Sequence, residues 1–125
     1  MHLPLSTYRI QFNKDFTFEQ LHNILDYLEA LGVTTIYAAP ILQAAPGSMH
    51  GYDVVDPHRI SADIGTVDEL KSLAEMLKEK KMGWLQDIVA NHMAFDTDNE
   101  RLMDVLERGS LSPFYYYFDV DLNHP

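Results

Sequence analysis

The chain has 125 residues, 46% of them hydrophobic, which is enough to bury the core of one modest domain and excludes a disordered segment. Nine basic residues against nineteen acidic ones give a formal net charge of −10, without a basic patch. We therefore expect neither nucleic acid nor a membrane surface as a partner. The chain contains no cysteine, which excludes a disulfide framework and a thiolate nucleophile.

The N-terminal sequence has neither the charged start nor the apolar core of a signal peptide. The longest apolar run, residues 36–42, is too short to cross a bilayer. We therefore expect a soluble, cytoplasmic protein.

The first part of the chain predicts a strand, a helix and a second strand. Alternating apolar residues indicate a strand over 7–12. Thr17 and Gln20 form a capping-box pattern before leucines at helical spacing, and Gly32 is a natural end for that helix. The compact, β-branched run 33–39 is typical of a strand covered on both faces.

The middle of the chain predicts a long loop, a second helix and a third strand. Segment 40–65 has no helical period and is interrupted by glycine and proline, so we expect a loop, and loops of this length are usually functional. A second capping box joins Thr66 and Glu69, and the helix that follows is predicted to end at Gly83. Residues 84–89 then form the third predicted strand.

The order strand–helix–strand–loop–helix–strand suits a parallel sheet, in which the loops after the strands lie on one face. The polar and aromatic segments 48–57 and 87–93 both fall on that face, where a parallel α/β fold builds its active site. After Asp96 the pattern changes to a short predicted helix over 97–108 and an aromatic segment, 112–121, with an extended bias.

Four segments taken together carry a family resemblance. They are SerThrTyrArgIleGlnPhe at 6–12, AlaProIleLeu at 39–42, SerMetHisGlyTyrAspValValAspPro at 48–57 and AspIleValAlaAsnHisMet at 87–93. The chain resembles the N-terminal part of the α-amylase superfamily of glycoside hydrolases. Segments 104–109 and 112–114 favour its trehalose-forming members. Ala90 departs from the family pattern, where proline is expected, but removes no functional group.

The resemblance implies an α/β fold, the N-terminal portion of a (β/α)8 TIM barrel with about three parallel β-α units. Residues 1–95 would be the first part of the barrel, and residues 96–125 the start of an inserted subdomain after the third strand. A whole barrel takes about 250 residues, so we expect the front part of something larger. Its exposed barrel edge would favour self-association.

The activity implied by the resemblance is retaining chemistry on α-1,4-glucans with two carboxylates and a covalent glycosyl-enzyme. Trehalose-forming members convert the reducing-end α-1,4 bond of a maltooligosaccharide into an α,α-1,1 bond by intramolecular transglucosylation. The nucleophile and the acid/base belong to later strands of the family, so we expect no catalytic residue in this chain and no activity from it alone. Asp63, Asp96 and Glu100 are available carboxylates, but nothing selects them as a catalytic pair.

The resemblance also assigns binding roles. Tyr52 would be the flat platform against the sugar at the cleavage subsite, and His50 and Asp53 would line the same pocket. His92 would bind the primary hydroxyl of that sugar as a neutral imidazole. Asp87 would support the site by pairing with an arginine from later in the family's sequence, and Asn91 would be a second supporting residue.

No metal and no cofactor are expected. Asn91 matches a residue that ligates structural calcium in many amylases, but the sequence offers no adequate oxygen cage. The four polar residues His50, Asp53, Asp87 and His92 also suggest a metal hydrolase, yet no pair has the spacing of two ligands on one helix.

Several of these residues also have a purely structural interpretation. Tyr52 could simply pack its loop, His92 could be a hydrogen-bonded structural histidine, and Asp87 could be a buried partner of the fold. The aromatic run 114–118 is interpreted as packing rather than as a sugar platform. Three functions remain open: a trehalose-forming glucan mutase, another hydrolase or transferase of the same superfamily, and a non-catalytic module that binds glucan or a partner.

Overall fold

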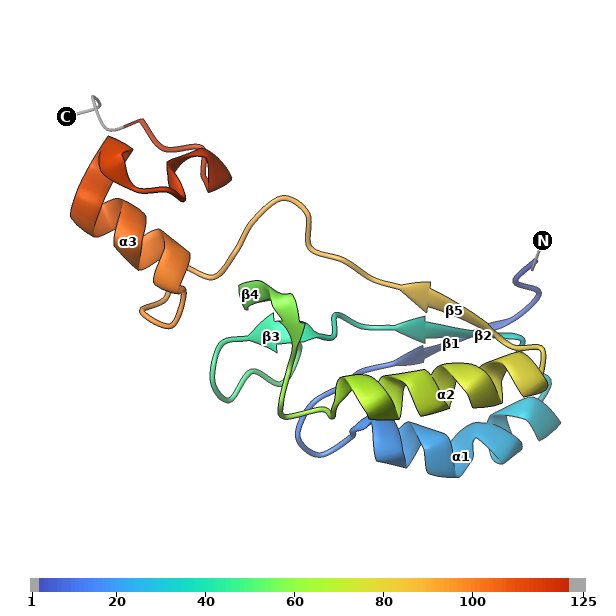
Figure 1. Ribbon diagram of the computed structural model, residues 1–125. Coiled ribbons are helices and arrows are strands. Elements are labelled where there is room, and N and C mark those ends of the chain that lie inside the picture. The colour runs from blue at the N-terminus through green and yellow to red at the C-terminus, as the bar shows by residue number, and fades with distance from the viewer. Residues whose placement is uncertain (1–2, 122–125) are drawn as a thin grey trace.

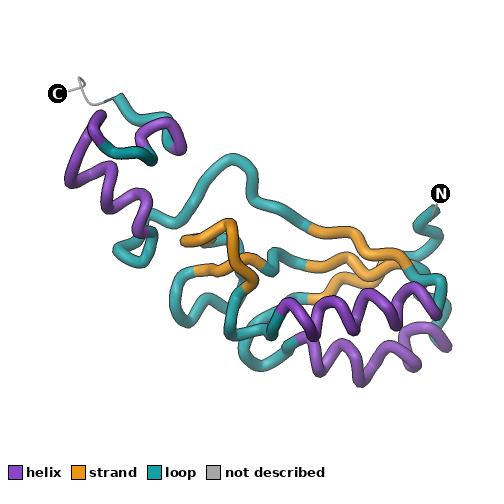
Figure 2. Tube along the Cα trace, in the orientation of Figure 1, coloured by secondary structure: helices purple, strands orange, loops and turns teal. Residues whose placement is uncertain are grey.

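The computed structural model describes residues 3–121, in which two helices cover one face of a three-stranded parallel sheet (Figure 1). The strands are β1 (Thr7–Ile10), β2 (Thr35–Ala38) and β5 (Gly83–Gln86), in the order β1-β2-β5. Residues Ile10, Ala38 and Gln86 are aligned across the sheet, so the three carboxyl ends meet at one edge. Figure 2 shows loops leaving this edge, as the sequence predicts for a parallel sheet.

Helices α1 (Phe18–Ala30) and α2 (Val67–Glu79) begin where the capping boxes predict. The Thr17 amide donates to Gln20 Oε1 at 2.9 Å, and the Thr66 amide donates to Glu69 Oε2 at 2.6 Å. These bonds satisfy amides that have no partner within the helix. Gly32, with φ of +86°, follows α1 as predicted.

The predicted end of α2 at Gly83 is wrong. The helix ends at Glu79, and Lys81 takes the left-handed conformation with φ of +56°. The Met82 amide then donates to the Leu77 carbonyl at 2.8 Å, closing the last turn, so the chain has already reversed and Gly83 begins β5.

The core lies between the sheet and the two helices. Its fully buried side chains include Phe12, Phe18, Leu21, Leu25, Leu28, Ile36 and Leu73. The Phe12 ring packs edge-on against Phe18, with centroids 5.2 Å apart, and stacks on Trp84 at 6.0 Å. Phe12 therefore fixes the chain directly after β1, and this places the residues on either side of it.

Segment 40–65 is not a single loop. β3 (Leu42–Ala44) and β4 (Val54–Ile60) form an antiparallel pair with two register shifts, and Pro57 lies inside β4. Proline lacks the amide that a regular ladder needs, which explains both the irregular pairing and the failure of the sequence pattern to predict it. The pair carries the turn 45–53 at its tip, beyond the carboxyl ends of the parallel strands.

The chain after β5 also differs from expectation. β5 ends at Gln86 instead of residue 89, and the Asp87 amide makes a further sheet bond to the Ala38 carbonyl at 2.9 Å. The chain then arches to α3 (Glu100–Arg108), which ends at Gly109 as predicted (Figure 1). Beyond α3, the short 3-10 helices Gly109–Leu111 and Tyr115–Tyr117 follow.

The predicted extended conformation of 112–121 is therefore wrong for its aromatic centre. Ser112 stabilises the turn instead, because its hydroxyl accepts from the Phe114 amide at 3.0 Å and its carbonyl accepts from the Tyr115 amide at 3.2 Å.

Within residues 3–121 no helix combines the length and apolarity needed to span a membrane. Residues 1–2, in the segment tested for a signal peptide, and residues 122–125, in the predicted subdomain, lie outside the described part.

Candidate functional site

Four side chains converge at the carboxyl edge of the sheet and form what we call the strand-end cluster: Arg9, Tyr37, Tyr52 and Asp87. The Tyr52 hydroxyl donates to Asp87 Oδ2 at 2.6 Å, and the Tyr37 hydroxyl donates to the same oxygen at 3.1 Å. Arg9 Nη2 donates to the Tyr52 hydroxyl at 3.3 Å. Residues from β2 and the β3–β4 turn thus meet at the Asp87 carboxylate after β5, and Arg9 of β1 joins them through the Tyr52 hydroxyl.

The electrostatics of the cluster follow from this arrangement. The hydrogen bond to the Asp87 carboxylate raises the pKa of Tyr37, because ionising that phenol would place two anions side by side. The hydrogen bond to Tyr52 raises the pKa of Arg9. The Arg9 guanidinium also lies 6.0 Å from the Tyr37 ring centroid, within the range of a cation–π contact.

The turn before Tyr52 is held in part by its own side chains. The Tyr52 amide donates to His50 Nδ1 at 3.1 Å, and the two rings stack with centroids 6.1 Å apart. Asp53 accepts a hydrogen bond from the Ser48 hydroxyl and lies 3.6 Å from His50 Nδ1. His50 and Asp53 thus lie beside Tyr52, and Asp53 stabilises the turn itself.

The cluster does not include every predicted site residue. His92 Nδ1 and Asn91 Oδ1 lie 3.2 Å apart, and both side chains are exposed on the arch that follows β5. The sugar-binding role of His92 and the supporting role of Asn91 stay predictions. The carboxylates Asp63, Asp96 and Glu100 lie in a turn after β4, before α3 and at the start of α3, and none of them is a member of the cluster.

Two members of the cluster, Arg9 and Tyr37, were not predicted as site residues. Each precedes the last residue of an observed strand, Ile10 of β1 or Ala38 of β2, whereas the predicted strands continue to residues 12 and 39, so the sequence did not mark these positions as strand ends. Across residues 3–121, no three His, Asp or Glu side chains come close enough together to hold a metal ion.

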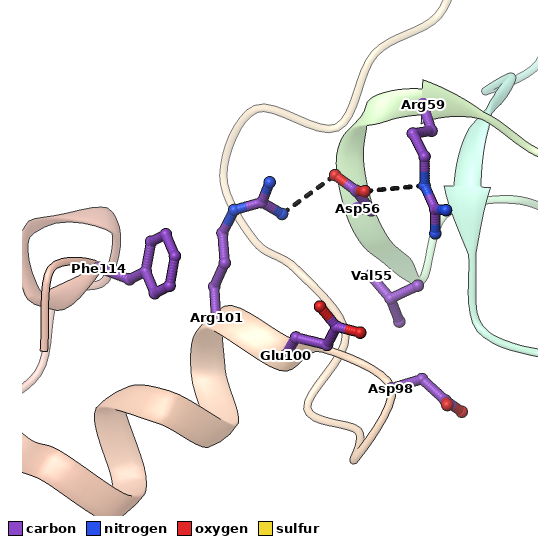
Figure 3. Close-up of a pocket in the computed structure, with 7 residues that line it drawn as sticks. All are labelled: Val55, Asp56, Arg59, Asp98, Glu100, Arg101 and Phe114. Atoms are coloured by element: carbon purple, nitrogen blue, oxygen red, sulfur yellow. Dashed lines mark hydrogen bonds and ion pairs between the residues drawn. The ribbon is translucent and has the colours of Figure 1, made fainter.

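A separate polar cavity of about 130 Å³ lies between β4 and α3 (Figure 3). Its lining consists of Val55, Asp56, Arg59, Asp98, Glu100, Arg101 and Phe114. Asp56 accepts from Arg101 and from Arg59, each at 3.0 Å, and the Arg101 guanidinium lies 5.8 Å from the Phe114 ring centroid. The ion pair between Asp56 and Arg101 therefore joins α3 to the β3–β4 pair.

The pKa of Asp56 reflects these partners. Burial alone would raise it, but the hydrogen bond from the His58 amide and the Arg101 guanidinium outweigh burial and lower the pKa of Asp56 below its ordinary value. The folded state therefore favours the ionised carboxylate at this position.

A parallel α/β sheet with polar side chains gathered at its carboxyl edge is typical of a (β/α)8 barrel, and comparison with known families agrees with this class. The family described as "Alpha amylase, catalytic domain" matches residues 17–118, so the chain belongs to the α-amylase family. The amylase-type neighbours and the parallel strands confirm the predicted α/β fold class, a portion of a (β/α)8 barrel.

Individual relatives show which members of the family this chain is similar to. Maltooligosyltrehalose synthase from Arthrobacter ramosus is 42% identical with a TM-score of 0.90, and a hypothetical maltooligosyl trehalose synthase from Sulfolobus tokodaii is 49% identical with a TM-score of 0.87. Each match covers 94% of this chain and 16% of the other. Alpha-amylase 2 of Schwanniomyces occidentalis is 34% identical over 86 residues, covering 64% of this chain and 17% of the relative. The chain thus spans about one sixth of the synthases that it matches.

Proposed function

We propose that this chain supplies part of the sugar-binding site of an enzyme that forms maltooligosyl trehalose from α-1,4-glucan oligosaccharides. The observation that carries the proposal is the bond between Tyr52 and Asp87, which fixes an aromatic ring at the carboxyl edge of a parallel sheet. The similarity to synthases at 42% and 49% identity supports the trehalose-forming reaction over simple hydrolysis.

The proposed reaction moves one glycosidic bond and consumes no water. A carboxylate nucleophile attacks C1 of the penultimate sugar and forms a covalent bond to it as the α-1,4 bond breaks. The leaving O4 receives a proton from the acid/base. The freed glucose then turns, and its anomeric hydroxyl attacks the same C1 while the bond from C1 to the carboxylate nucleophile breaks and the hydroxyl proton returns to the acid/base. The product is an isomer of the substrate with an α,α-1,1 bond.

Within this reaction, the proposed role of Tyr52 is to present its flat ring to the C–H face of the sugar at the cleavage subsite. Asp87 orients that ring through the hydroxyl group, and His50 extends the aromatic surface. His92 and Asp53 are proposed to bind sugar hydroxyls. Neither carboxylate of the catalytic pair is assigned to this chain, so we propose that the 125 residues alone are inactive.

The proposed location is the cytoplasm, and the proposed partners include a second copy of the chain. Leu85 on edge strand β5 is 50% exposed, and Leu70, Leu77 and Trp84 line an apolar groove beside it. Unpaired strand edges and uncovered apolar surface favour association. A concentration series in the analytical ultracentrifuge tests this, and a monomer at every concentration would contradict it.

The function is tested with a chimera: the Arthrobacter ramosus synthase in which this chain replaces the matching segment. The chimera is incubated with maltopentaose, and the products are separated and analysed by NMR for the α,α-1,1 bond. A non-reducing isomer of the substrate is the predicted product. Glucose and shorter maltooligosaccharides alone would indicate another superfamily activity. An inactive chimera, together with tight glucan binding by the isolated chain, would indicate a non-catalytic module.

A further inference from the structure

Segment 6–12 contributes to the family resemblance, yet the proposed function gives its polar residues no role. Ile10 and Phe12 are 4% and 2% exposed, so they point into the core. Because side chains alternate along extended chain, Arg9, Gln11 and Asn13 share the opposite side. Each of these three residues donates a hydrogen bond to the turn that carries Tyr52.

The three donors lie two residues apart, and their acceptors follow in reverse order along the turn. Arg9 Nη2 reaches the Tyr52 hydroxyl at 3.3 Å, and Gln11 Nε2 reaches the His50 carbonyl at 2.9 Å. Asn13 Nδ2 reaches the Met49 carbonyl at 3.3 Å. One face of the first strand and its extension therefore holds three positions of the turn.

The turn is also confined from its other side. Gly51 has φ of +77°, and a Cβ atom added there would lie 2.7 Å from the Pro40 carbonyl oxygen. A side chain at this position is therefore excluded twice, by backbone conformation and by lack of space. The Gly51 amide donates to the Ser48 hydroxyl oxygen at 3.1 Å.

Arg9 and Gln11 act on Tyr52 as a pair. Arg9 Nη2 donates to Gln11 Oε1 at 2.9 Å, which holds the guanidinium in place, while the amide nitrogen of Gln11 binds the turn. The Tyr52 hydroxyl accepts from Arg9 and donates to Asp87. A phenol bound from both sides by fixed partners has little freedom to rotate or to tilt.

We infer that Arg9 and Gln11 are positioning residues that set the orientation of the Tyr52 ring for the sugar. The inference rests on the proposed function, since it assigns to segment 6–12 the task of preparing the surface on which the sugar stacks. Neither residue needs to touch the sugar. Their effect passes through the hydroxyl of Tyr52 and the backbone of His50.

A spectroscopic test uses the 125-residue chain with 13C-labelled tyrosine, in which the Tyr52 signal is assigned by its loss in Tyr52→Phe. Arg9→Met is expected to shift the Tyr52 ring signals and leave those of Tyr27, which is exposed on α1, unchanged. Arg9→Lys keeps a cationic donor and should restore part of the shift. Arg108→Met is the matched control, because Arg108 is also exposed and makes one ion pair, with Asp104.

The same substitutions are then compared in the chimera. Arg9→Met is expected to lower kcat about tenfold, since small misplacement of a group at the reacting centre is costly, and Arg9→Lys should recover part of that loss. Gln11→Met should act in the same direction with a smaller effect. Arg108→Met should leave kcat unchanged.

The outcomes separate the inference from the function on which it rests. An unsubstituted chimera that forms no α,α-1,1 product would overturn the proposed function. A chimera that forms the product, with Arg9→Met giving unchanged kcat or unchanged Tyr52 signals, would overturn the inference alone. Far-UV circular dichroism of each variant checks folding, and if Arg9→Met is unfolded, Arg9→Lys and Gln11→Met decide the question.

Discussion

The strand-end cluster and the cavity at Asp56 both bring carboxylate, arginine and aromatic side chains together, but they distribute charge differently. Asp56 forms ion pairs with two arginines. Asp87 instead accepts from two tyrosine hydroxyls, and among residues 3–121 it has no ion pair. A carboxylate neutralised within the fold is suited to joining elements, whereas one bound only by neutral donors keeps its charge for a further partner, as the proposed pairing with a later arginine requires.

The largest expected difference between the two carboxylates concerns activity. Asp87→Ala in the chimera removes the acceptor of the Tyr52 hydroxyl and is expected to lower kcat about a hundredfold. Asp56→Ala should change kcat by less than about threefold, because Asp56 acts on α3 and not on the cluster. Initial rates of α,α-1,1 product formation provide the measurement, and equal losses in the two variants would contradict the division of roles.

The two substitutions should affect stability in the reverse order, with Asp56→Ala costing more than Asp87→Ala. Asp56→Ala leaves Arg101, whose side chain is 19% exposed, without its carboxylate. We expect the free energy of unfolding to fall by about 1–2 kcal/mol, allowing for solvent screening at this partly exposed site. Asp87→Ala should cost about half as much, because the two tyrosine hydroxyls can turn to water. Urea unfolding of both variants of the 125-residue chain compares them.

The contribution of Asp56 should depend on pH. Its pKa is lowered in the folded state, so the stabilisation is complete above the unfolded value of about 3.9 and is lost as the pH falls through the folded value. Asp56→Asn should therefore be less stable than the parent chain at about pH 6 and approach it at about pH 3. A stability difference that stays constant between these conditions would show that the charge of Asp56 is not what matters.

The smallest predicted effect is a change in the pKa of Tyr37. Asp87→Asn removes the carboxylate that raises the pKa of this phenol, so the pKa should fall towards the ordinary value of about 10. The hydrogen bond stabilises the fold at pH values below the pKa that Tyr37 has in the unfolded chain. This stabilisation is lost as the pH rises through the higher pKa of Tyr37 in the folded state. A titration of the tyrosine Cζ signals by NMR checks this, with exposed Tyr27 as the control.

Local features of the fold could be predicted from the sequence, and the reason is that they leave local marks. The capping boxes at Thr17 and Thr66 each need only four consecutive residues. The β3–β4 pair could not be predicted, because its register is irregular and Pro57 interrupts the strand pattern. Lys81 in the left-handed conformation similarly breaks the rule that would place glycine there.

The candidate site shows the same limit. Tyr52 and Asp87 were predicted through the family resemblance, not from their spacing, and the structure brings them into contact. Arg9 and Tyr37 were missed because their bonds join residues 43 and 50 positions apart in the chain. Hydrogen bonds between such distant positions depend on the assembled sheet, and nothing in a single sequence marks them.

The central claim is that Tyr52, as held in the strand-end cluster, is a surface for the sugar. The most direct test compares Tyr52→Ala with Tyr27→Ala in the chimera by the rate of α,α-1,1 product formation from maltopentaose. Tyr27 is a matched control because its ring is 63% exposed on α1. We predict a loss of at least about tenfold for Tyr52→Ala alone, as expected when a stacking surface is removed at the reacting sugar. Equal rates in the two variants would contradict the account.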